Sequence, residues 1–337
     1  DGDGNWSVTP EPVLADDTQV SATATDAAGN KSEPTTQAVD AAAPDAPTIA
    51  SASDDVEPLT DDLADGDSTN DTTPTLTGRA EAGSTVEVFQ GDTSLGTTEV
   101  NDQGNWNFTP DELAEAGVSF TATATDAAGN TSPASDAFTL TIDETAPDAP
   151  TIDPTDGTEL TGTAEAGSTV NIDTNGDGEV DETATADGDG NWSVTPETVL
   201  ADDTQVSATA TDAAGNESEP TTQTVDATAP AAPVIANATD DVEPLTDDLA
   251  DGDSTNDLTP TLTGTAEAGS TVEVFQNDTS LGTTDADDQG NWSFTPDELT
   301  DGSSYSFTAE ATDAAGNTSD ASETFTLTID ETAPNVP

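Results

Sequence analysis

The stretch Gly104-Asn105-Trp106-Asn107-Phe108-Thr109-Pro110 decides the fold, because large aromatic residues alternate with asparagine before a closing proline. Alternation with a period of two is typical of a half-buried β-strand. The Gly-Asn-Trp triplet occurs four times, with tryptophans at positions 6, 106, 192 and 292. A repeat of about 100 residues is too long for a solenoid unit and suits an array of small β domains.

The same alternation recurs along the repeating unit. Apolar residues alternate with hydroxyl residues from Val118 to Thr125, and Phe138, Leu140 and Ile142 alternate with polar residues. No segment has a convincing helical stripe. The pattern predicts strands near residues 47–51, 74–80, 85–90, 95–100, 105–109, 118–125 and 137–143. Seven short strands in such a unit predict an all-β fold of tandem immunoglobulin-like sandwiches, arranged as an extended rod.

Proline pairs mark the boundaries of the units. Ala-Pro-Asp-Ala-Pro occupies residues 43–47 and 146–150, and Ala-Pro-Ala-Ala-Pro occupies 229–233. Such connectors are short, stiff and extended. They predict a long repeat at 44–147, a short repeat at 148–229 and a second long repeat at 230–337. Residues 1–43 match the second half of a short repeat, which alone is expected not to close a core.

The composition excludes several classes of function. The 337 residues carry a net charge of −69, with 2 lysines and arginines and no cysteine or histidine. Disulfides, cysteine or histidine zinc sites and histidine-dependent nucleophiles are therefore impossible. The scarcity of cations argues against nucleic-acid partners, and no apolar run is long enough to span a bilayer. High acidity with low hydrophobicity is typical of disordered chains, but the strand periodicity argues against disorder.

The carboxylates gather at loops and junctions, where they predict calcium sites. Small inward residues such as Ala122 and Ala124 bury little apolar area and therefore stabilise the fold only weakly. About twenty carboxylates per unit also repel one another. Something must offset both effects, and bound cations would do so. Ca²⁺ takes six to eight oxygen ligands, and this chain offers oxygen donors without soft ligands. For any single acidic residue, a solvated surface position remains the simpler interpretation.

The sharpest local motif is Asp173-Thr174-Asn175-Gly176-Asp177-Gly178-Glu179-Val180-Asp181. It matches the start of an EF-hand loop, and its candidate ligands are Asp173, Asn175, Asp177, Glu179 through its carbonyl, and Asp181. Ala184 stands where an EF-hand has its bidentate glutamate, which favours a calcium loop inside a β-hairpin. A plain turn rich in glycine and aspartate is the alternative.

Each long repeat has an acidic insertion between its first two predicted strands, at residues 54–71 and again at 240–257. Asp65-Gly66-Asp67 followed by Asp71 has the spacing to wrap one ion. A solvated acidic loop is an equally good interpretation.

The junctions are predicted to combine three segments: the end of one unit with its linker, and two separate loops of the next unit. In an immunoglobulin-like domain those two loops lie at the end where the chain enters, beside the last strand of the preceding unit. The candidate ligands are Asp40, Asp45, Glu81, Asp126 and Asn130 at the first junction; Asp143, Glu144, Asp148, Glu165, Asp212 and Asn216 at the second; and Asp226, Glu267, Asp313 and Asn317 at the third. Ala231 replaces the linker aspartate at the third junction, which is therefore expected to bind most weakly.

Three stretches carry a family resemblance. Asn-Asp-Thr-Thr-Pro-Thr-Leu-Thr-Gly at 70–78, Ala-Thr-Asp-Ala-Ala-Gly-Asn at 124–130 and Gly-Asn-Trp-Ser-Phe-Thr-Pro at 290–296 resemble the tandem bacterial Ig-like repeats of giant biofilm adhesins. The resemblance covers nearly the whole chain. It implies an extracellular, calcium-rigidified extender at the surface of a Gram-negative bacterium, exported by type I secretion and often accompanied by repeats-in-toxin segments. It also implies that Asp143, Asp148, Glu165, Asp212 and their counterparts bind junction calcium, and that neighbouring repeats of a monomeric rod are the main partners. The anchor, adhesive tip and secretion signal of such adhesins are not found in this sequence.

The location of the tryptophans distinguishes the extender from its main alternative. Buried tryptophans fit a structural stalk, whereas tryptophans exposed on one face fit a module that binds polysaccharide or a host protein. Glycoside hydrolysis by paired carboxylates is a third possibility. The acids recur with every repeat, which argues against a unique catalytic site.

Overall fold

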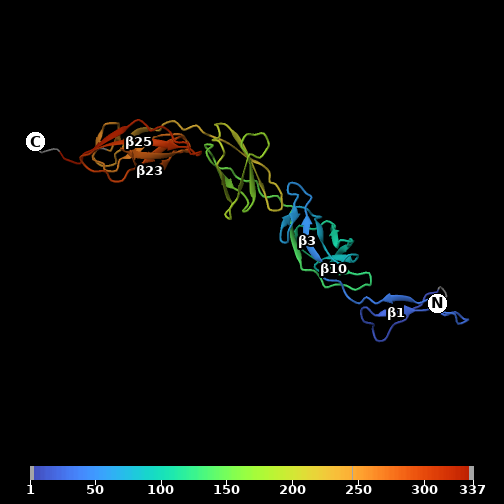
Figure 1. Cartoon of the computed structure of the whole chain (residues 1–337). Coiled ribbons are helices and arrows are strands. Elements are labelled where there is room, and N and C mark those ends of the chain that lie inside the picture. Colours follow the sequence, from blue (N-terminus) through green and yellow to red (C-terminus); the bar gives the residue numbers. More distant parts are fainter. Residues whose placement is uncertain (1–3, 245, 334–337) are drawn as a thin grey trace. The chain divides into compact units, whose positions relative to one another are not determined.

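The computed structural model describes residues 4–244 and 246–333. Every regular element in these ranges is a β-strand. The strands follow one another along the chain without a helix between them in the described ranges (Figure 1). The chain divides into two compact units: residues 1–146 together with 213–216, and residues 147–212 together with 217–337. The all-β prediction is thus confirmed.

The first long repeat is a sandwich of two sheets in unit 1. One sheet has the strand order β4-β3-β6-β9 and the other the order β5-β11-β10-β7-β8. The strands are β3 (Thr48–Ser53), β4 (Asp62–Leu63), β5 (Ser68–Thr69), β6 (Thr75–Arg79), β7 (Thr85–Gln90), β8 (Thr93–Glu99), β9 (Asn105–Phe108), β10 (Ala116–Thr125) and β11 (Phe138–Ile142). The seven predicted strands are all present within one or two residues at most ends. The two short strands of the insertion, β4 and β5, were not predicted.

The alternating residues fill the core between the two sheets, as their period requires. Val86, Val88 and Phe120 are fully buried, while their neighbours along each strand are less buried. Trp106 is only 4% exposed and lies in the same cluster. The tryptophan of the repeated triplet is therefore a core residue.

Strand β5 ties the insertion to the last strand of the repeat. It pairs in parallel with β11, and three backbone bonds join the two segments: Gly66 N–H to Thr139 O (2.8 Å), Thr141 N–H to Asp67 O (2.9 Å) and Asp143 N–H to Thr69 O (3.0 Å). The other insertion strand, β4, pairs with β3. The acidic insertion is thus part of the sandwich.

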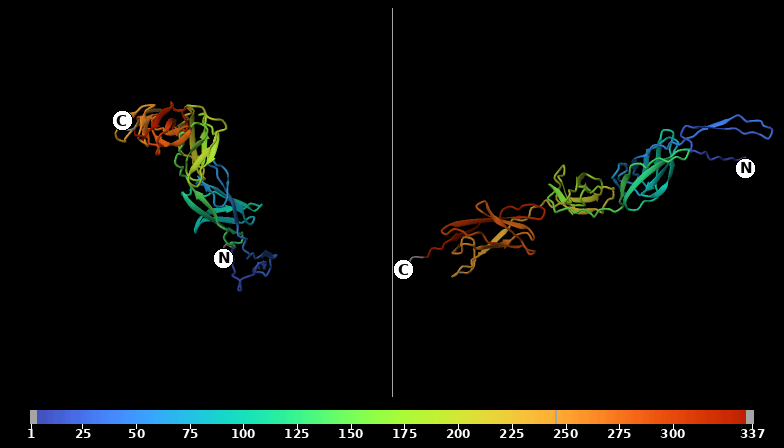
Figure 2. Two further views of the ribbon diagram at one scale, coloured as in Figure 1. Left: turned by 90° about the vertical axis from the view of Figure 1, so that its left-hand side faces the viewer. Right: turned by 90° about the horizontal axis from the view of Figure 1, so that it is seen from below.

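The second long repeat, in unit 2, has the same topology. Its sheets have the orders β19-β18-β21-β24 and β20-β26-β25-β22-β23. The strands are β18 (Val234–Thr239), β19 (Asp248–Leu249), β20 (Ser254–Thr255), β21 (Thr261–Thr265), β22 (Thr271–Gln276), β23 (Thr279–Asp285), β24 (Asn291–Phe294), β25 (Ser304–Thr312) and β26 (Phe325–Ile329). Further views of the ribbon show the layered sandwich within each repeat (Figure 2).

The short repeat, also in unit 2, has no insertion strands among the described residues. A two-stranded sheet β12-β15 faces a four-stranded sheet β14-β13-β16-β17. The strands are β12 (Leu160–Thr163), β13 (Thr169–Asp173), β14 (Glu182–Thr185), β15 (Asn191–Val194), β16 (Gln205–Thr211) and β17 (Thr221–Thr224). Its core cluster is smaller than those of the long repeats and contains Trp192, Leu160 and Ile172.

Residues 4–43 form a hairpin, in which β1 (Gln19–Ala22) pairs with β2 (Thr35–Ala38). The stretch Asn5–Val8 forms no strand here, whereas the equivalent strand β9 pairs with β6 in the long repeat. The segment 4–43 contains no counterpart of β6. Trp6 is 71% exposed, in agreement with the expectation that this segment closes no core by itself.

Candidate functional site

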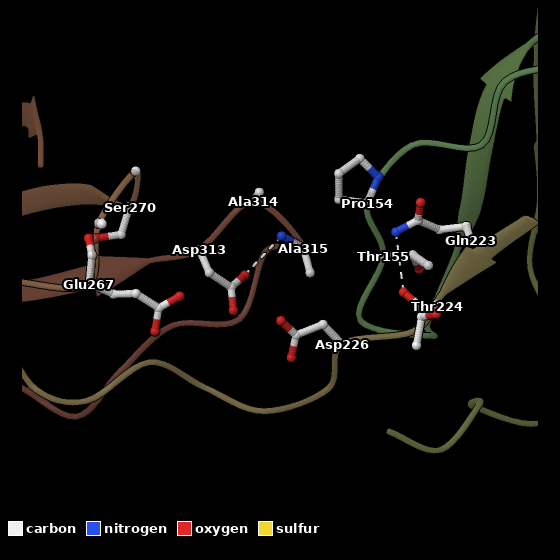
Figure 3. Close-up of a pocket in the computed structure, with 12 residues that line it drawn as sticks. Pro154, Thr155, Gln223, Thr224, Asp226, Glu267, Ser270, Asp313, Ala314 and Ala315 are labelled. Atoms are coloured by element: carbon white, nitrogen blue, oxygen red, sulfur yellow. Dashed lines mark hydrogen bonds between the residues drawn. The ribbon is translucent and has the colours of Figure 1, made fainter. Parts of the chain in front are cut away.

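The third junction, within unit 2, brings three of its predicted residues around one cavity. Asp226 follows β17, Glu267 lies in the loop between β21 and β22, and Asp313 follows β25. They line a cavity of about 270 Å³ (Figure 3). Three segments that are far apart in the sequence therefore lie around this cavity, and calcium binding there stays a prediction.

Asn317 connects the two sides of this junction. Its Nδ2 donates hydrogen bonds to the backbone oxygen of Asp226 (2.7 Å) and to Oδ2 of Asp313 (2.9 Å). The other carboxylate oxygen of Asp313 accepts from the N–H groups of Ala315 and Asn317, both at 2.9 Å. The loop closes through Gly316, whose φ of +94° favours glycine. The Asp-Ala-Ala-Gly-Asn loop therefore aims an amide at the last carbonyl of the preceding repeat.

The first junction, within unit 1, has the same amide contact. Asn130 Nδ2 donates to Asp40 O at 3.3 Å and to Asp126 Oδ2 at 2.8 Å. The Asn130 side chain, followed by backbone N–H groups of the loop, lowers the pKa of Asp126. Asp45 and Glu81 are exposed.

The second junction is divided between the two units. Within unit 1, Asn216 Nδ2 donates to Asp143 O at 2.8 Å, and the Asp143 carboxylate accepts from Thr145 N–H at 3.0 Å. Asp148, Glu165 and Asp212 belong to unit 2. The side chain of Asp148 is exposed, and the Glu165 backbone oxygen accepts the Ser168 hydroxyl at 2.7 Å.

This repeated asparagine contact is a role that the sequence did not reveal. The asparagines were expected as oxygen donors to a metal, yet in each case the amide NH₂ faces a backbone carbonyl. The four identical Asp-Ala-Ala-Gly-Asn segments are the sequence feature that could have indicated a repeated contact. A loop of fixed sequence at every junction is consistent with one repeated contact.

The loop at 173–181 joins β13 to β14, as predicted for a hairpin. Asp173 accepts backbone N–H groups of Asn175, Gly176 and Gly178 at 2.7–3.0 Å. Burial opposes ionisation of Asp173, but these backbone hydrogen bonds outweigh it and lower its pKa. Asp181 accepts from Thr174 and from the Asn175 side chain. The loop is thus ordered by carboxylates that point inward.

The two other acidic members of this loop differ in their contacts. Asp177 Oδ1 accepts the Glu179 N–H at 2.9 Å. Glu179 itself is exposed. The loop is closed by positive φ angles at Gly176 and Gly178, where nothing would clash with a larger side chain.

The insertion carboxylates Asp65, Asp67 and Asp71 contact different parts of the backbone. Asp65 accepts the N–H and hydroxyl of Thr139, both at 2.7 Å, and these bonds lower its pKa. Asp67 accepts the Ala64 N–H at 2.7 Å, and Asp71 accepts the Thr73 N–H at 2.7 Å. Asp67 and Asp71 therefore bond within their own turns, whereas Asp65 ties the insertion to β11. The single-ion loop stays a prediction.

The insertions also bury carboxylates, which the sequence did not predict. Thr255 donates its hydroxyl to Asp240 (2.6 Å) and accepts the Asp257 N–H (2.9 Å). Asp257 is 1% exposed, and its Oδ2 has no hydrogen-bond partner among the described residues. Thr69 and Asp54 repeat the first of these bonds in unit 1. An unpaired buried carboxylate oxygen is costly and suits a cation.

The donor chemistry of these clusters fits calcium, because every candidate ligand is an oxygen. Among residues 4–244 and 246–333, however, no three acidic side chains are gathered closely enough to hold a metal ion. The calcium assignments therefore stay predictions.

The tryptophans provide no exposed binding face within the sandwiches. Trp106, Trp192 and Trp292 are each at most 4% exposed. Because these tryptophans are buried, they do not form the exposed face that a polysaccharide-binding module would need.

In the described part of the chain, no helix is long and apolar enough to span a membrane.

The chain was compared with solved structures and with curated proteins. A bacterial ice-binding adhesin structure is 21% identical over 79% of this chain and 95% of its own, with a TM-score of 0.29. The BSP domain of a biofilm-associated protein is 17% identical over 87% of this chain and 67% of its own, with a TM-score of 0.25. The fibronectin(III)-like modules of Clostridium thermocellum CbhA are 17% identical over 52% and 90%, with a TM-score of 0.33. No curated protein matches the sequence.

Two family models cover most of the chain from residue 45 onward. The model described as bacterial Ig-like domain matches residues 45–144 and 233–331, and the model described as bacterial Ig domain matches residues 146–227. Three matches in succession fit the three sandwiches described above. The chain belongs to the bacterial Ig-like domain family.

Proposed function

We propose that this chain is a calcium-rigidified extender segment of a bacterial surface adhesin. It would place a distal adhesive domain away from the cell, in biofilm formation or surface attachment. The observation that carries the proposal is the third junction, where Asp226, Glu267 and Asp313 from three segments line one cavity.

A bound cation would bring the three carboxylates that line this cavity closer together than they lie in the structure, and it would offset the repulsion that such an approach creates. Like charges about 4 Å apart cost about 4 kcal/mol at an effective dielectric of about 20, before screening by salt. Bound Ca²⁺ would supply positive charge and oxygen coordination at such a cluster. Asp226 belongs to the end of one repeat, whereas Glu267 and Asp313 belong to the next. Ligands divided in this way would fix the angle between the two repeats.

Two further observations support cation binding. Asp257 Oδ2 is buried without a partner among the described residues. In the loop at 173–181, Asp173 and Asp181 both accept hydrogen bonds from groups within the loop, which places two carboxylates on its inner side.

The cellular setting is part of the same proposal. The compared structures include an adhesin described by its retention at a host cell surface and a biofilm-associated protein. By analogy we assign this chain an extracellular location on a Gram-negative cell, with export by type I secretion and a monomeric rod-like form. Neighbouring repeats of the same polypeptide would be its partners.

Thermal unfolding and small-angle scattering with Ca²⁺ and with chelator test this proposal. Ligands that bind only the folded state stabilise it by about 2.7 kcal/mol per site at a hundredfold excess over Kd. With several sites per repeat, Ca²⁺ should raise the Tm by tens of degrees and increase the maximum dimension in scattering. Mg²⁺ at equal ionic strength is the control for screening. If Ca²⁺ and Mg²⁺ each raise the Tm by only the same few degrees, the stabilisation is due to charge screening and the calcium sites are contradicted.

A further inference from the structure

The Asp-Ala-Ala-Gly-Asn loops have one sequence but different burial. Ala214 and Gly215 are buried, with Ala214 only 2% exposed. The equivalent Ala128 and Gly129 are exposed, and so is Gly316. Because the loop sequence is constant, the difference comes from what precedes each loop. The buried loop follows a long repeat, whereas the loops at 126–130 and 313–317 follow short ones.

The acidic insertion of the first long repeat covers the buried loop. Residues 213–216 lie within unit 1, where Asn70 N–H donates to Ala214 O at 3.0 Å. A Cβ atom on Gly215 would lie 3.3 Å from Cγ of Leu59, so this leucine packs over the glycine. Both Asn70 and Leu59 belong to the insertion, which short repeats lack.

The same surface exists in the second long repeat. Asp54, Asp61, Asp62, Leu63, Asp67 and Ser68 line a cavity of about 450 Å³ that Ala213 and Ala214 help to close. Their equivalents in unit 2, Asp240, Asp247, Asp248, Leu249, Asp253 and Ser254, line a cavity of about 830 Å³. Its other lining residues include Asn256, the equivalent of Asn70, and the segment Asp330–Ala333. The larger cavity has no Asp-Ala-Ala-Gly-Asn loop in its lining.

The chain around this cavity is also repeated. Asp330-Glu331-Thr332-Ala333-Pro334 has the same sequence as residues 143–147, which lead into the short repeat. The insertions share Glu-Pro-Leu-Thr-Asp-Asp-Leu-Ala-Asp-Gly-Asp-Ser-Thr-Asn-Asp from Glu57 and from Glu243. The groups that contact the buried loop are therefore present twice.

We infer that the cavity lined by residues 240, 244, 247–249, 253–256 and 330–333 is a docking seat for the Asp-Ala-Ala-Gly-Asn loop of a short repeat. The Asn256 N–H would donate to the carbonyl of the second alanine of the loop, as Asn70 does to Ala214. Small residues are needed at Ala214 and Gly215, because Ala214 is buried and a Cβ atom on Gly215 would lie 3.3 Å from Leu59. This docking uses backbone and apolar contacts, so it goes beyond the proposed calcium function and does not depend on it.

The inference makes long and short repeats complementary. A long repeat ends in a seat, and the loop of a following short repeat fills it. A short repeat ends without a seat, and the next loop makes the asparagine contact alone. The insertion is thus a recognition element that favours alternation of the two repeat types.

Amide hydrogen exchange tests this inference in the whole chain. A second copy of residues 148–229 is joined after Pro334, and exchange at Asn256 is measured in Ca²⁺ and in chelator. We expect exchange at Asn256 to slow at least tenfold under both conditions. Unchanged exchange at Asn256 would overturn the docking seat, whereas a result limited to Ca²⁺ would assign the protection to calcium instead.

A matched variant separates docking from simple proximity. Ala214→Asp, made in the appended copy alone, should abolish the protection of Asn256. The same substitution in the original repeat should speed exchange at Asn70 at least tenfold. Protection at Ala210 reports that the short repeat remains folded. Equal protection of Asn256 by the intact and substituted loops would contradict the proposal.

Discussion

Gly78 and Trp106 are direct partners across strands β6 and β9. A Cβ atom on Gly78 would lie 2.6 Å from Cζ2 of the indole and 1.9 Å from the backbone oxygen of Thr48. The indole therefore lies against bare backbone. The same pairing joins Gly162 to Trp192 and Gly264 to Trp292. The missing side chain at each glycine leaves the space that the indole fills at the same place in all three sandwich cores.

Substituting Gly78 by alanine should destabilise the first long repeat by about 3 kcal/mol or more, because the added methyl group overlaps both backbone and indole. The urea midpoint of that repeat, followed by amide exchange within β6 and β9, measures the change. Gly117→Ala is the matched control, since nothing lies within 4 Å of a Cβ there. Equal effects of the two substitutions would show that the close approach is not the cause.

Ser132→Ala should destabilise the same repeat by about 1–3 kcal/mol, the usual cost of leaving a buried donor unpaired. Ser132 Oγ accepts the Ala124 N–H at 2.9 Å and donates to Pro133 O at 2.7 Å. The serine is buried, so water does not readily replace it. Chemical denaturation measures the loss, with exposed Ser119→Ala as control. If the free energy of unfolding falls no more than in the control variant, the hydrogen bonds of Ser132 do not stabilise the repeat.

Acid should weaken the long repeats through Asp65 and Asp251. Hydrogen bonds from the side chains and N–H groups of Thr139 and Thr326 lower the pKa of these carboxylates in the folded state. Their stabilising contribution is therefore complete above the unfolded pKa of about 4 and is lost as pH falls through the folded pKa. Asp251→Asn should flatten the fall of the urea midpoint between about pH 4 and pH 2. A pH profile that stays parallel to that of the unsubstituted chain would contradict this assignment.

Asp173→Asn should weaken calcium binding to the 173–181 loop at least tenfold. The substitution removes a charge from the carboxylate around which the backbone of the loop is folded. Calorimetric titration of the whole chain, with exposed Glu217→Gln as control, should show the loss of one class of site. If both variants bind as the unsubstituted chain does, the loop is an ordinary turn.

Ala231→Asp should strengthen calcium binding at the third junction, because it restores the linker carboxylate present as Asp45 and Asp148. The calcium concentration that gives half of the scattering change should fall by several-fold. Asp148→Ala is the reciprocal test at the second junction and should raise that concentration without unfolding either repeat. If neither Ala231→Asp nor Asp148→Ala changes this calcium concentration, the linker position does not supply a calcium ligand.

The sandwich could be predicted because its strands alternate strictly. Period two places Val86, Val88 and Phe120 on one face, and the structure buries them. Strands β4 and β5 were missed because Asp62–Leu63 and Ser68–Thr69 are too short to show a period. The insertion is rich in aspartate, so the sequence indicated an exposed loop. The burial of Thr69 and Asp71 could not be predicted from it.

The sequence could indicate which residues lie near one another at a junction, but not which hydrogen bonds they form. Asp226, Glu267 and Asp313 line one cavity, since the topology decides which loops share an end, and their role as ligands stays a prediction. The direction of an asparagine amide depends on local geometry. The donation from Asn317 to Asp226 O therefore required coordinates.

The parallel pairing of β5 with β11 determines how a repeat responds to tension. Pulling on the two ends of a long repeat loads the three bonds at Thr139, Thr141 and Asp143 together, in shear. The short repeat has no parallel strand in its described sheets, and Asp226 N–H to Thr155 O is the corresponding bond there. Under a rising force the short repeats should open first and act as extensible elements. The long repeats should keep their structure and limit how far the chain lengthens.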